Sequence, residues 1–191
     1  MIKFITLLLV CSLISSGNIS AGKIKAALYA TDNYHLDPKL ICAIRDRAKE
    51  MYGIKIVFKG RLKFPEKADN GYKAEAFTRK LNRKRGNQEF AIGLTEQDII
   101  RYHIWDWDFT FTVDTILGYT DIPGGSCIIS YARLQDSLTL SRTVNVVMHE
   151  MGHLVGLDHC DDENCLMIAY DHLDNSSLCP ICKKKLQKIK P

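Results

Sequence analysis

Residues 149–159 read HEMGHLVGLDH, and this stretch is the strongest indication in the sequence of the fold and the chemistry of the chain. A helix turns by about 100° per residue, so His149 and His153 project from one face and can hold a single metal ion. Glu150 lies one position further round, where its carboxylate can reach a water beside the metal rather than the metal itself. The pattern therefore indicates a zinc-hydrolase centre with Glu150 as the general base.

A third histidine follows just beyond the expected end of this helix. Gly156 can adopt the left-handed backbone conformation that ends a helix and turns the chain. His159 can then return to the metal as a third ligand, which completes the pattern HExxHxxGxxH. Catalytic zinc sites keep one position open for water or substrate, whereas structural sites use four protein ligands. Three histidines thus predict a catalytic zinc site.

Helical and strand-like patterns precede the metal motif. Asp37 and Pro38 form a good helix start, and Gly53 is a good helix end. Elsewhere, apolar residues recur with a helical period or alternate with a period of two. We expect helices over 38–52, 71–86 and from near Ser141, a turn at 122–125, and strands over 54–59, 89–95, 105–113 and 126–131. These elements predict an α+β fold with an active-site helix.

The strand expected over 126–131 lies just before the active-site helix in the sequence. It could form a sheet edge along the cleft and pair with an extended peptide substrate through its backbone. It could equally be an ordinary interior strand. Both alternatives remain open at the level of sequence.

The composition suits one globular domain, with 191 residues, 46% hydrophobic and 25% charged, and a formal net charge of +4. After the first residues, no hydrophobic run is long enough to span a bilayer. Basic residues gather at 79–85 and 183–190 without interleaved aromatic residues, which favours solvated helix ends over nucleic-acid binding. We expect a monomer with no nucleic-acid partner and no membrane insertion.

The first 21 residues have the layout of a secretory signal. Lys3 precedes an uncharged run over 4–14, and small and polar residues lead to Ala21. Cleavage after Ala21 would remove Lys3 and no acidic residue, so the formal charge would fall from +4 to +3. A buried N-terminal helix and a lipoprotein anchor at Cys11 are the alternatives; bulky Val10 argues against the anchor. We therefore expect an exported protein, periplasmic or secreted.

The last 35 residues are too few to bury a core of their own, but they contain two close pairs of cysteines. Cys160 and Cys165 form C-x4-C, and Cys179 and Cys182 form C-x2-C. Four such thiolates favour a tetrahedral structural zinc, although two disulfides are the alternative in an oxidising compartment. Two further cysteines, Cys42 and Cys127, could be buried thiols or pair with each other.

This arrangement resembles the archaemetzincins, a group of zinc-dependent metallopeptidases. The resemblance covers residues 90–182 and rests on HExxHxxGxxH followed at once by Cys160, then by Met167 and the last cysteine pair. It implies a metzincin fold with a mixed twisted sheet, catalytic zinc on the three histidines, Glu150 as base and structural zinc on the four cysteines. It also implies that Met167 forms the Met-turn beneath the catalytic metal. Tyr170 could donate to a developing oxyanion, as a nearby tyrosine does in some metzincins; a surface or core position is the alternative.

Together these observations predict an exported zinc peptidase that acts on peptide or protein substrates and binds two zinc ions, one catalytic and one structural. The mature domain would span 22–191, with the sheet and zinc helix in 22–155 and a small zinc-stapled C-terminal subdomain in 156–191. One alternative is a catalytically silent zinc-binding protein that retains the site. Another is an exported disulfide-stapled domain whose histidines bind metal only incidentally.

Overall fold

A computed structural model of the chain describes residues 24–31, 37–63, 67–68, 71–104, 111–134, 138–169 and 173–189. The predicted signal sequence over 1–21 and Tyr170 lie outside the described residues. No helix in the described parts of the chain is long and apolar enough to cross a membrane.

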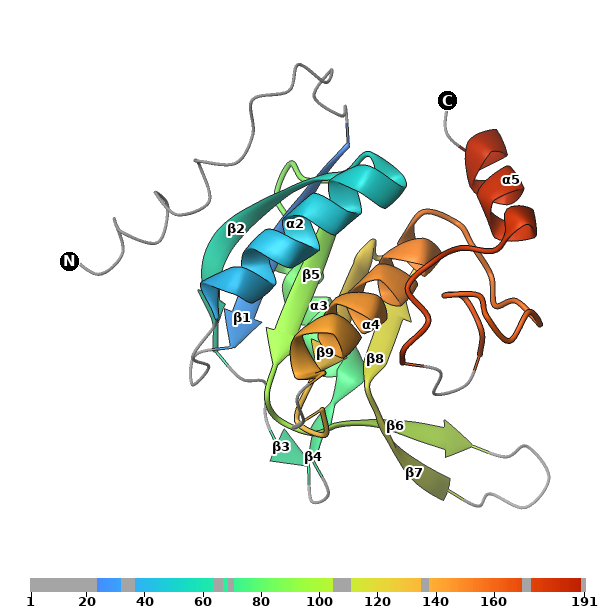
Figure 1. The fold of residues 1–191 in the computed structure, drawn as a ribbon. Coiled ribbons are helices and arrows are strands. Elements are labelled where there is room, and N and C mark those ends of the chain that lie inside the picture. The colour runs from blue at the N-terminus through green and yellow to red at the C-terminus, as the bar shows by residue number, and fades with distance from the viewer. Residues whose placement is uncertain are drawn as a thin grey trace.

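A five-stranded mixed sheet organises the molecule, with strand order β2-β1-β5-β9-β8 (Figure 1). The first four strands in this order run parallel, and only β8 is antiparallel to its neighbour. The strands are β1 (Lys25–Thr31), β2 (Lys55–Leu62), β5 (Phe90–Thr95), β8 (Gly118–Asp121) and β9 (Ser126–Ser130). The α+β fold with a mixed sheet is confirmed.

Helices cover both faces of this sheet. Helices α2 (Pro38–Tyr52) and α4 (Thr139–Leu154) pack side by side on one face, and α3 (Ala74–Lys84) covers the other (Figure 1). Strand β1 is buried on both sides, because Leu28 packs with the α2 and α4 cluster whereas Ala27 packs with α3. Helix α4 thus lies on β8 and β9, at the end of the sheet that carries the antiparallel edge strand.

The predicted helix over 38–52 is confirmed together with both of its ends. The Asp37 side chain accepts a hydrogen bond from the Lys39 backbone N–H at 2.9 Å, and Pro38 occupies the first helical turn. Gly53 ends the helix in the left-handed conformation, with φ of 71°. Helix α4 begins at Thr139, two residues before the predicted start near Ser141.

The helix predicted over 71–86 starts three residues later than expected. Gly71–Lys73 forms strand β4, and the helix α3 starts only at Ala74. Strand β4 pairs with β3 (Lys67–Ala68) and with β6 (Ile99–Ile104), and β6 pairs with β7 (Phe111–Ile116) in a second sheet of order β3-β4-β6-β7. The pairing of β4 with β6 joins Tyr72 to Ile99, which are far apart in the sequence, so local periodicity could not reveal it.

The strand predicted over 105–113 is only partly testable, because residues 105–110 lie outside the described part of the chain. Residues 111–113 begin β7, which continues to Ile116 and pairs antiparallel with β6. The β6–β7 hairpin extends away from the main sheet on the side of β8 (Figure 1).

The strand predicted over 126–131 is β9, and the idea that it forms a substrate-binding edge is wrong. It pairs with β5 on one side and β8 on the other, so its backbone groups are already used. The edge is instead β8, which a tight turn at 122–125 connects to β9. A four-residue strand of sequence GYTD carries too weak a pattern to be recognised in advance.

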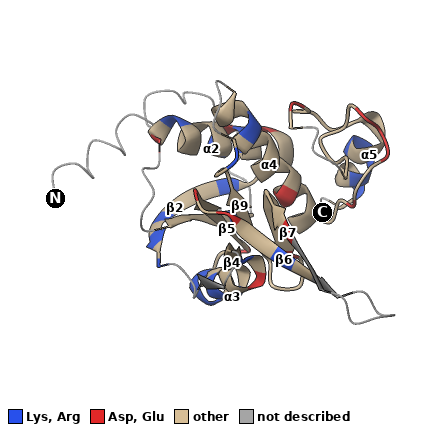
Figure 2. Ribbon diagram, turned by 90° about the horizontal axis from the view of Figure 1, so that it is seen from below, with Lys and Arg blue, Asp and Glu red and all other residues tan. Residues whose placement is uncertain are grey.

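The two basic clusters lie on separate helices. Figure 2 shows lysine and arginine on α3 and on α5 (Pro180–Ile189), in different parts of the molecule. Arg79, Arg83 and Lys84 on α3 are exposed, as are Lys183, Lys184 and Lys185 on α5. The arrangement matches the expected solvated helix faces rather than one continuous basic surface.

Candidate metal centre

Helix α4 presents His149 and His153 on one face, as the spacing predicted. The two ring centroids lie 4.8 Å apart, and the two Nε2 atoms are 3.2 Å apart. Val147, Met148 and Met151, on the same helix, are almost completely buried in the core. This packing holds the helix against the sheet and so gives the two imidazoles a rigid base.

The chain turns at Gly156 and brings His159 to the same point. Gly156 adopts the left-handed conformation, with φ of 92°, and its N–H donates to the His153 carbonyl at 3.0 Å. The Leu157 N–H donates to the Gly152 carbonyl at 2.9 Å. The His159 Nε2 then lies 3.2 Å from the His153 Nε2. All three histidines thus offer nitrogen atoms within 4.8 Å of one another, which is the cluster that the motif predicted.

Backbone carbonyls orient two of the rings. The Nδ1 of His149 lies 2.7 Å from the Leu166 carbonyl oxygen, and the Nδ1 of His153 lies 2.8 Å from the Leu157 carbonyl oxygen. A carbonyl only accepts, so each Nδ1 carries the proton and each Nε2 keeps a lone pair for a metal. Burial lowers the pKa of His149 to about 4 and also lowers the pKa of His153. Neutral imidazoles of this orientation fit zinc.

Met167 lies where the Met-turn was expected, under the metal-binding helix. It is completely buried, and its side chain packs against Gly152. A Cβ added at Gly152 would overlap the Met167 sulfur and lie 2.9 Å from its terminal methyl carbon. Gly152 sits between the two histidines, and the sequence motif leaves that position unspecified. Its role was therefore missed, although a glycine inside a core helix is itself a signal of close packing.

Glu150 is buried with its carboxylate against β8. Thr120 Oγ1 lies 2.5 Å from Glu150 Oε2, and a Cβ added at Gly118 would overlap the carboxylate. Burial raises the pKa of Glu150 to about 7, and the hydrogen bond from Thr120 opposes part of that increase. Neither Gly118 nor Thr120 was singled out from the sequence, because β8 itself was not recognised.

A cavity of about 540 Å³ opens beside the histidines and Glu150. Its walls are formed by helix α4, the segment over 115–118, Leu134 beyond the end of β9, and tail residues within 166–169 and 173–175. Arg101 of β6 and Arg133 also line it. His149, His159 and the Glu150 carboxylate therefore line a space that can admit part of a substrate.

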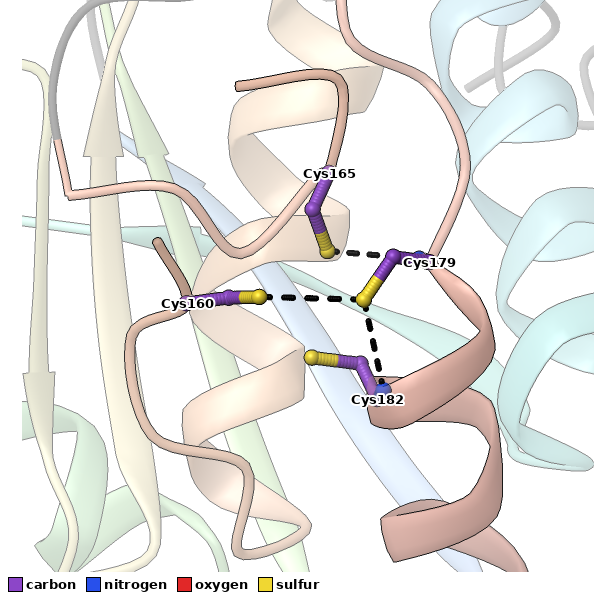
Figure 3. A group of neighbouring side chains, drawn as sticks. All are labelled: Cys160, Cys165, Cys179 and Cys182. Atoms are coloured by element: carbon purple, nitrogen blue, oxygen red, sulfur yellow. Dashed lines mark hydrogen bonds between the residues drawn. The ribbon is translucent and has the colours of Figure 1, made fainter. Parts of the chain in front are cut away.

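The four cysteines of the tail converge on one point (Figure 3). Their sulfur atoms lie within 4.8 Å of one another, and all four are free thiols. The Cys160 and Cys179 sulfurs are 3.7 Å apart, which is much longer than the roughly 2.05 Å of a disulfide bond. Backbone N–H groups of Met167, Cys179 and Cys182 point at sulfur atoms of the cluster. This geometry fits a tetrahedral metal site and not the alternative of two disulfides.

For the other two cysteines, the alternative of a Cys42–Cys127 disulfide is excluded. Cys127 of β9 is a free, completely buried thiol, so it does not pair with Cys42.

The two clusters share one short segment of chain. Cys160 directly follows His159, and its backbone N–H donates to the Met167 carbonyl at 2.8 Å. The Leu166 carbonyl, which orients His149, belongs to the same segment, and the Leu166 N–H donates to the Ser177 carbonyl at 2.8 Å. The cysteine cluster therefore fixes the part of the tail that contacts the histidine cluster.

Comparison with protein families matches residues 23–190 to peptidase family M54. The chain belongs to this family. An archaemetzincin of Methanopyrus kandleri is 29% identical over 161 residues, which cover 78% of this chain and 87% of that relative. The crystal structure of archaemetzincin from Methanopyrus kandleri aligns with a TM-score of 0.73 and 27% identity, covering 93% of this chain and 98% of the other.

A second archaemetzincin shares the fold at lower sequence identity. The archaemetzincin of Archaeoglobus fulgidus aligns with a TM-score of 0.65 over 85% of this chain and 99% of that one, at 19% identity. The archaemetzincin resemblance found in the sequence is thus confirmed, and the chain is a zinc metallopeptidase.

Proposed function

We propose that this M54 peptidase hydrolyses peptide bonds with a water molecule that Glu150 deprotonates, at a zinc ion held by His149, His153 and His159. The observation that carries the proposal is the convergence of three imidazole nitrogens, two of whose histidines, His149 and His159, line one open cavity together with the buried Glu150. A zinc-binding protein without activity is disfavoured, because such a protein would have no use for a buried Glu150 facing that cavity.

Zinc bound by these histidines would supply a Lewis acid for the scissile carbonyl and, as a nearby cation, would favour the ionised form of Glu150. Glu150 then takes a proton from the attacking water and delivers it to the leaving amine nitrogen. Burial raises its pKa to about 7 in the metal-free protein, and a nearby zinc ion would oppose this increase, so that the carboxylate is ionised and can accept a proton near neutral pH.

The substrate would bind as an extended chain along β8. Strand β8 pairs with β9 on one side and, among the described residues, has no strand partner on the other. Its first residue, Gly118, lines the cavity together with Glu150 and His149. A peptide that adds to this edge would form backbone hydrogen bonds and bring a peptide bond to the base.

A second zinc ion on Cys160, Cys165, Cys179 and Cys182 would have a structural role. Four sulfur ligands leave no position open for substrate, and the four come from a tail too short to form its own core. The tail over 156–191 would be the small subdomain of a monomeric enzyme whose mature domain spans 22–191.

Export is proposed from residues 1–21 alone, whose composition supports a cleaved signal. A free amino terminus at Gly22 in protein recovered outside the cytoplasm would support this proposal, and an intact Met1 would contradict it.

The experiment for the catalytic proposal is digestion of a mixed peptide library by the zinc-loaded protein and by its Glu150→Gln variant. Mass spectrometry of the new termini reports both cleavage and its position. The parent should cleave, and the variant should bind the same amount of zinc and leave the library intact. A variant that cleaves as well as the parent would contradict the role of Glu150.

A further inference from the structure

Strand β8 presents two residues to the Glu150 side chain. Gly118 and Thr120 are two positions apart, so both face the same side of the strand, toward α4. Tyr119 and Asp121 face the other way: Tyr119 packs with the cluster around α3, and Asp121 accepts a hydrogen bond from an α3 side chain at 2.8 Å. The face of β8 that is directed toward α4 thus approaches the Glu150 carboxylate at both Gly118 and Thr120.

Thr120 supplies the side-chain hydrogen bond to that carboxylate. Its Oγ1 lies 2.5 Å from Glu150 Oε2 and 3.2 Å from the Glu150 backbone carbonyl oxygen. A hydroxyl has one hydrogen to donate, and Oε2 is both nearer and charged. The Thr120 hydroxyl therefore donates to Glu150 Oε2 rather than to the backbone carbonyl. Glu150 is only 8% exposed, so its carboxylate needs a partner of this kind in place of water.

Gly118 makes room for the same carboxylate. A Cβ at this position would overlap Oε1 and lie 2.8 Å from the Glu150 Cγ. The side chain is therefore confined from two sides, by the hydrogen bond between Thr120 and Oε2 and by the space at Gly118, which Oε1 occupies in place of a Cβ. Few rotamers of Glu150 satisfy both conditions.

We infer that Thr120 is a positioning residue for the catalytic base, with Gly118 providing the space that lets the base take its position. This inference rests on the proposed role of Glu150. It also links substrate to base, because the strand that would pair with the peptide is the strand that holds the carboxylate.

The test compares Thr120→Val, which keeps the shape and removes the hydroxyl, with Thr120→Ser, which keeps the hydroxyl. Thr78→Val is the matched control, since Thr78 is a buried threonine on α3 whose hydroxyl donates only within its own helix, to the Glu75 carbonyl at 3.2 Å. Each zinc-loaded variant is measured for kcat and KM on a cleaved peptide, for zinc content, and for the position of Glu150 by crystallography.

Thr120→Val should lower kcat about 10- to 100-fold, with little change in KM or in zinc content. Its crystal structure should show the Glu150 carboxylate displaced from β8. Thr120→Ser should restore most of kcat, and Thr78→Val should match the parent. Parent-like kcat in Thr120→Val, or equal losses in the valine and serine variants, would overturn the positioning role.

Failure of this inference is distinguishable from failure of the proposed function. If Glu150→Gln is inactive while Thr120→Val keeps the parent kcat, only the positioning role is wrong. If Glu150→Gln is itself active, the general-base role is wrong and the inference about Thr120 falls with it.

Discussion

At the scale of residues, the absence of a side chain at Gly152 lets Met167 pack beneath the two helical histidines. A Cβ there would overlap the Met167 sulfur and lie 3.1 Å from the Tyr52 hydroxyl oxygen. Tyr52 is itself held, because its hydroxyl donates to the Met148 carbonyl at 2.7 Å. Neither neighbour can move away without breaking core contacts.

Gly152→Ala should therefore destabilise the fold by about 1–3 kcal/mol, the usual effect of overpacking a core. Denaturant unfolding measures this change in the free energy of unfolding. Repeating the substitution in a Met167→Ala background tests the cause, because the smaller side chain removes the overlap. The effect of Gly152→Ala should then be much smaller, and an equal effect in both backgrounds would contradict this explanation.

At the scale of elements, helix α4 is tied to the tail along its length. Arg142 near its start forms an ion pair with Asp174, with Arg142 Nε 2.9 Å from Asp174 Oδ1. Asn145 Nδ2 donates to the Leu173 carbonyl at 2.8 Å, and His149 reaches the Leu166 carbonyl. The tail, which forms one wall of the cavity, is thus held in place by its contacts with α4.

The ion pair makes part of this attachment depend on pH. The hydrogen bond from Arg142 holds the pKa of Asp174 below its ordinary value of about 3.9. A carboxylate with a lowered folded-state pKa stabilises the fold above its ordinary pKa, and that contribution is lost as the pH falls through the folded-state value. Asp174→Asn should thus lower the thermal midpoint slightly at pH 7 and have no effect at strongly acidic pH.

The control for this prediction is Asp161→Asn, which removes an exposed carboxylate from the same tail. It should change the thermal midpoint less than Asp174→Asn at pH 7. The effect of Asp174→Asn is expected to be small because the pair is at the surface and solvent screens it. An Asp174→Asn difference that persists unchanged into acid would contradict the assignment.

The cysteine cluster should influence the histidine cluster through the chain that joins them. Cys160→Ser should remove the zinc of the tail and also weaken zinc binding at His159, its neighbour in sequence. Zinc titration of the metal-free variant, followed by native mass spectrometry, measures both effects. Loss of one zinc with unchanged affinity for the other would show that the two sites are independent.

What could be predicted from the sequence was the chemistry that is local in the chain. The HExxH spacing, the turn at Gly156 and the cysteine pairs each place ligands within a few residues of one another, so a helix period and a turn rule suffice. Thr120 and Gly118 reach Glu150 across about thirty residues through a sheet edge. That contact depends on strand order, which no local pattern contains.

At the scale of the whole molecule, the sheet and the tail hold opposite sides of one site. The antiparallel edge strand β8 contacts Glu150, the proposed base, α4 carries two histidines, and the tail brings the third histidine together with the carbonyl that orients the first. The core beneath α4 is continuous with the cluster around the cysteines. Loss of metal from either cluster should therefore lower the stability of the whole domain.

The most direct measurement of the central claim is a zinc titration of the metal-free protein in which cleavage rate and zinc content are recorded at each point. The parent should be inactive without zinc and should gain activity in step with occupancy of the histidine site. Glu150→Gln should bind zinc with the same stoichiometry and stay inactive throughout. Cleavage by the metal-free parent, or by the fully loaded Glu150→Gln variant, would contradict the account.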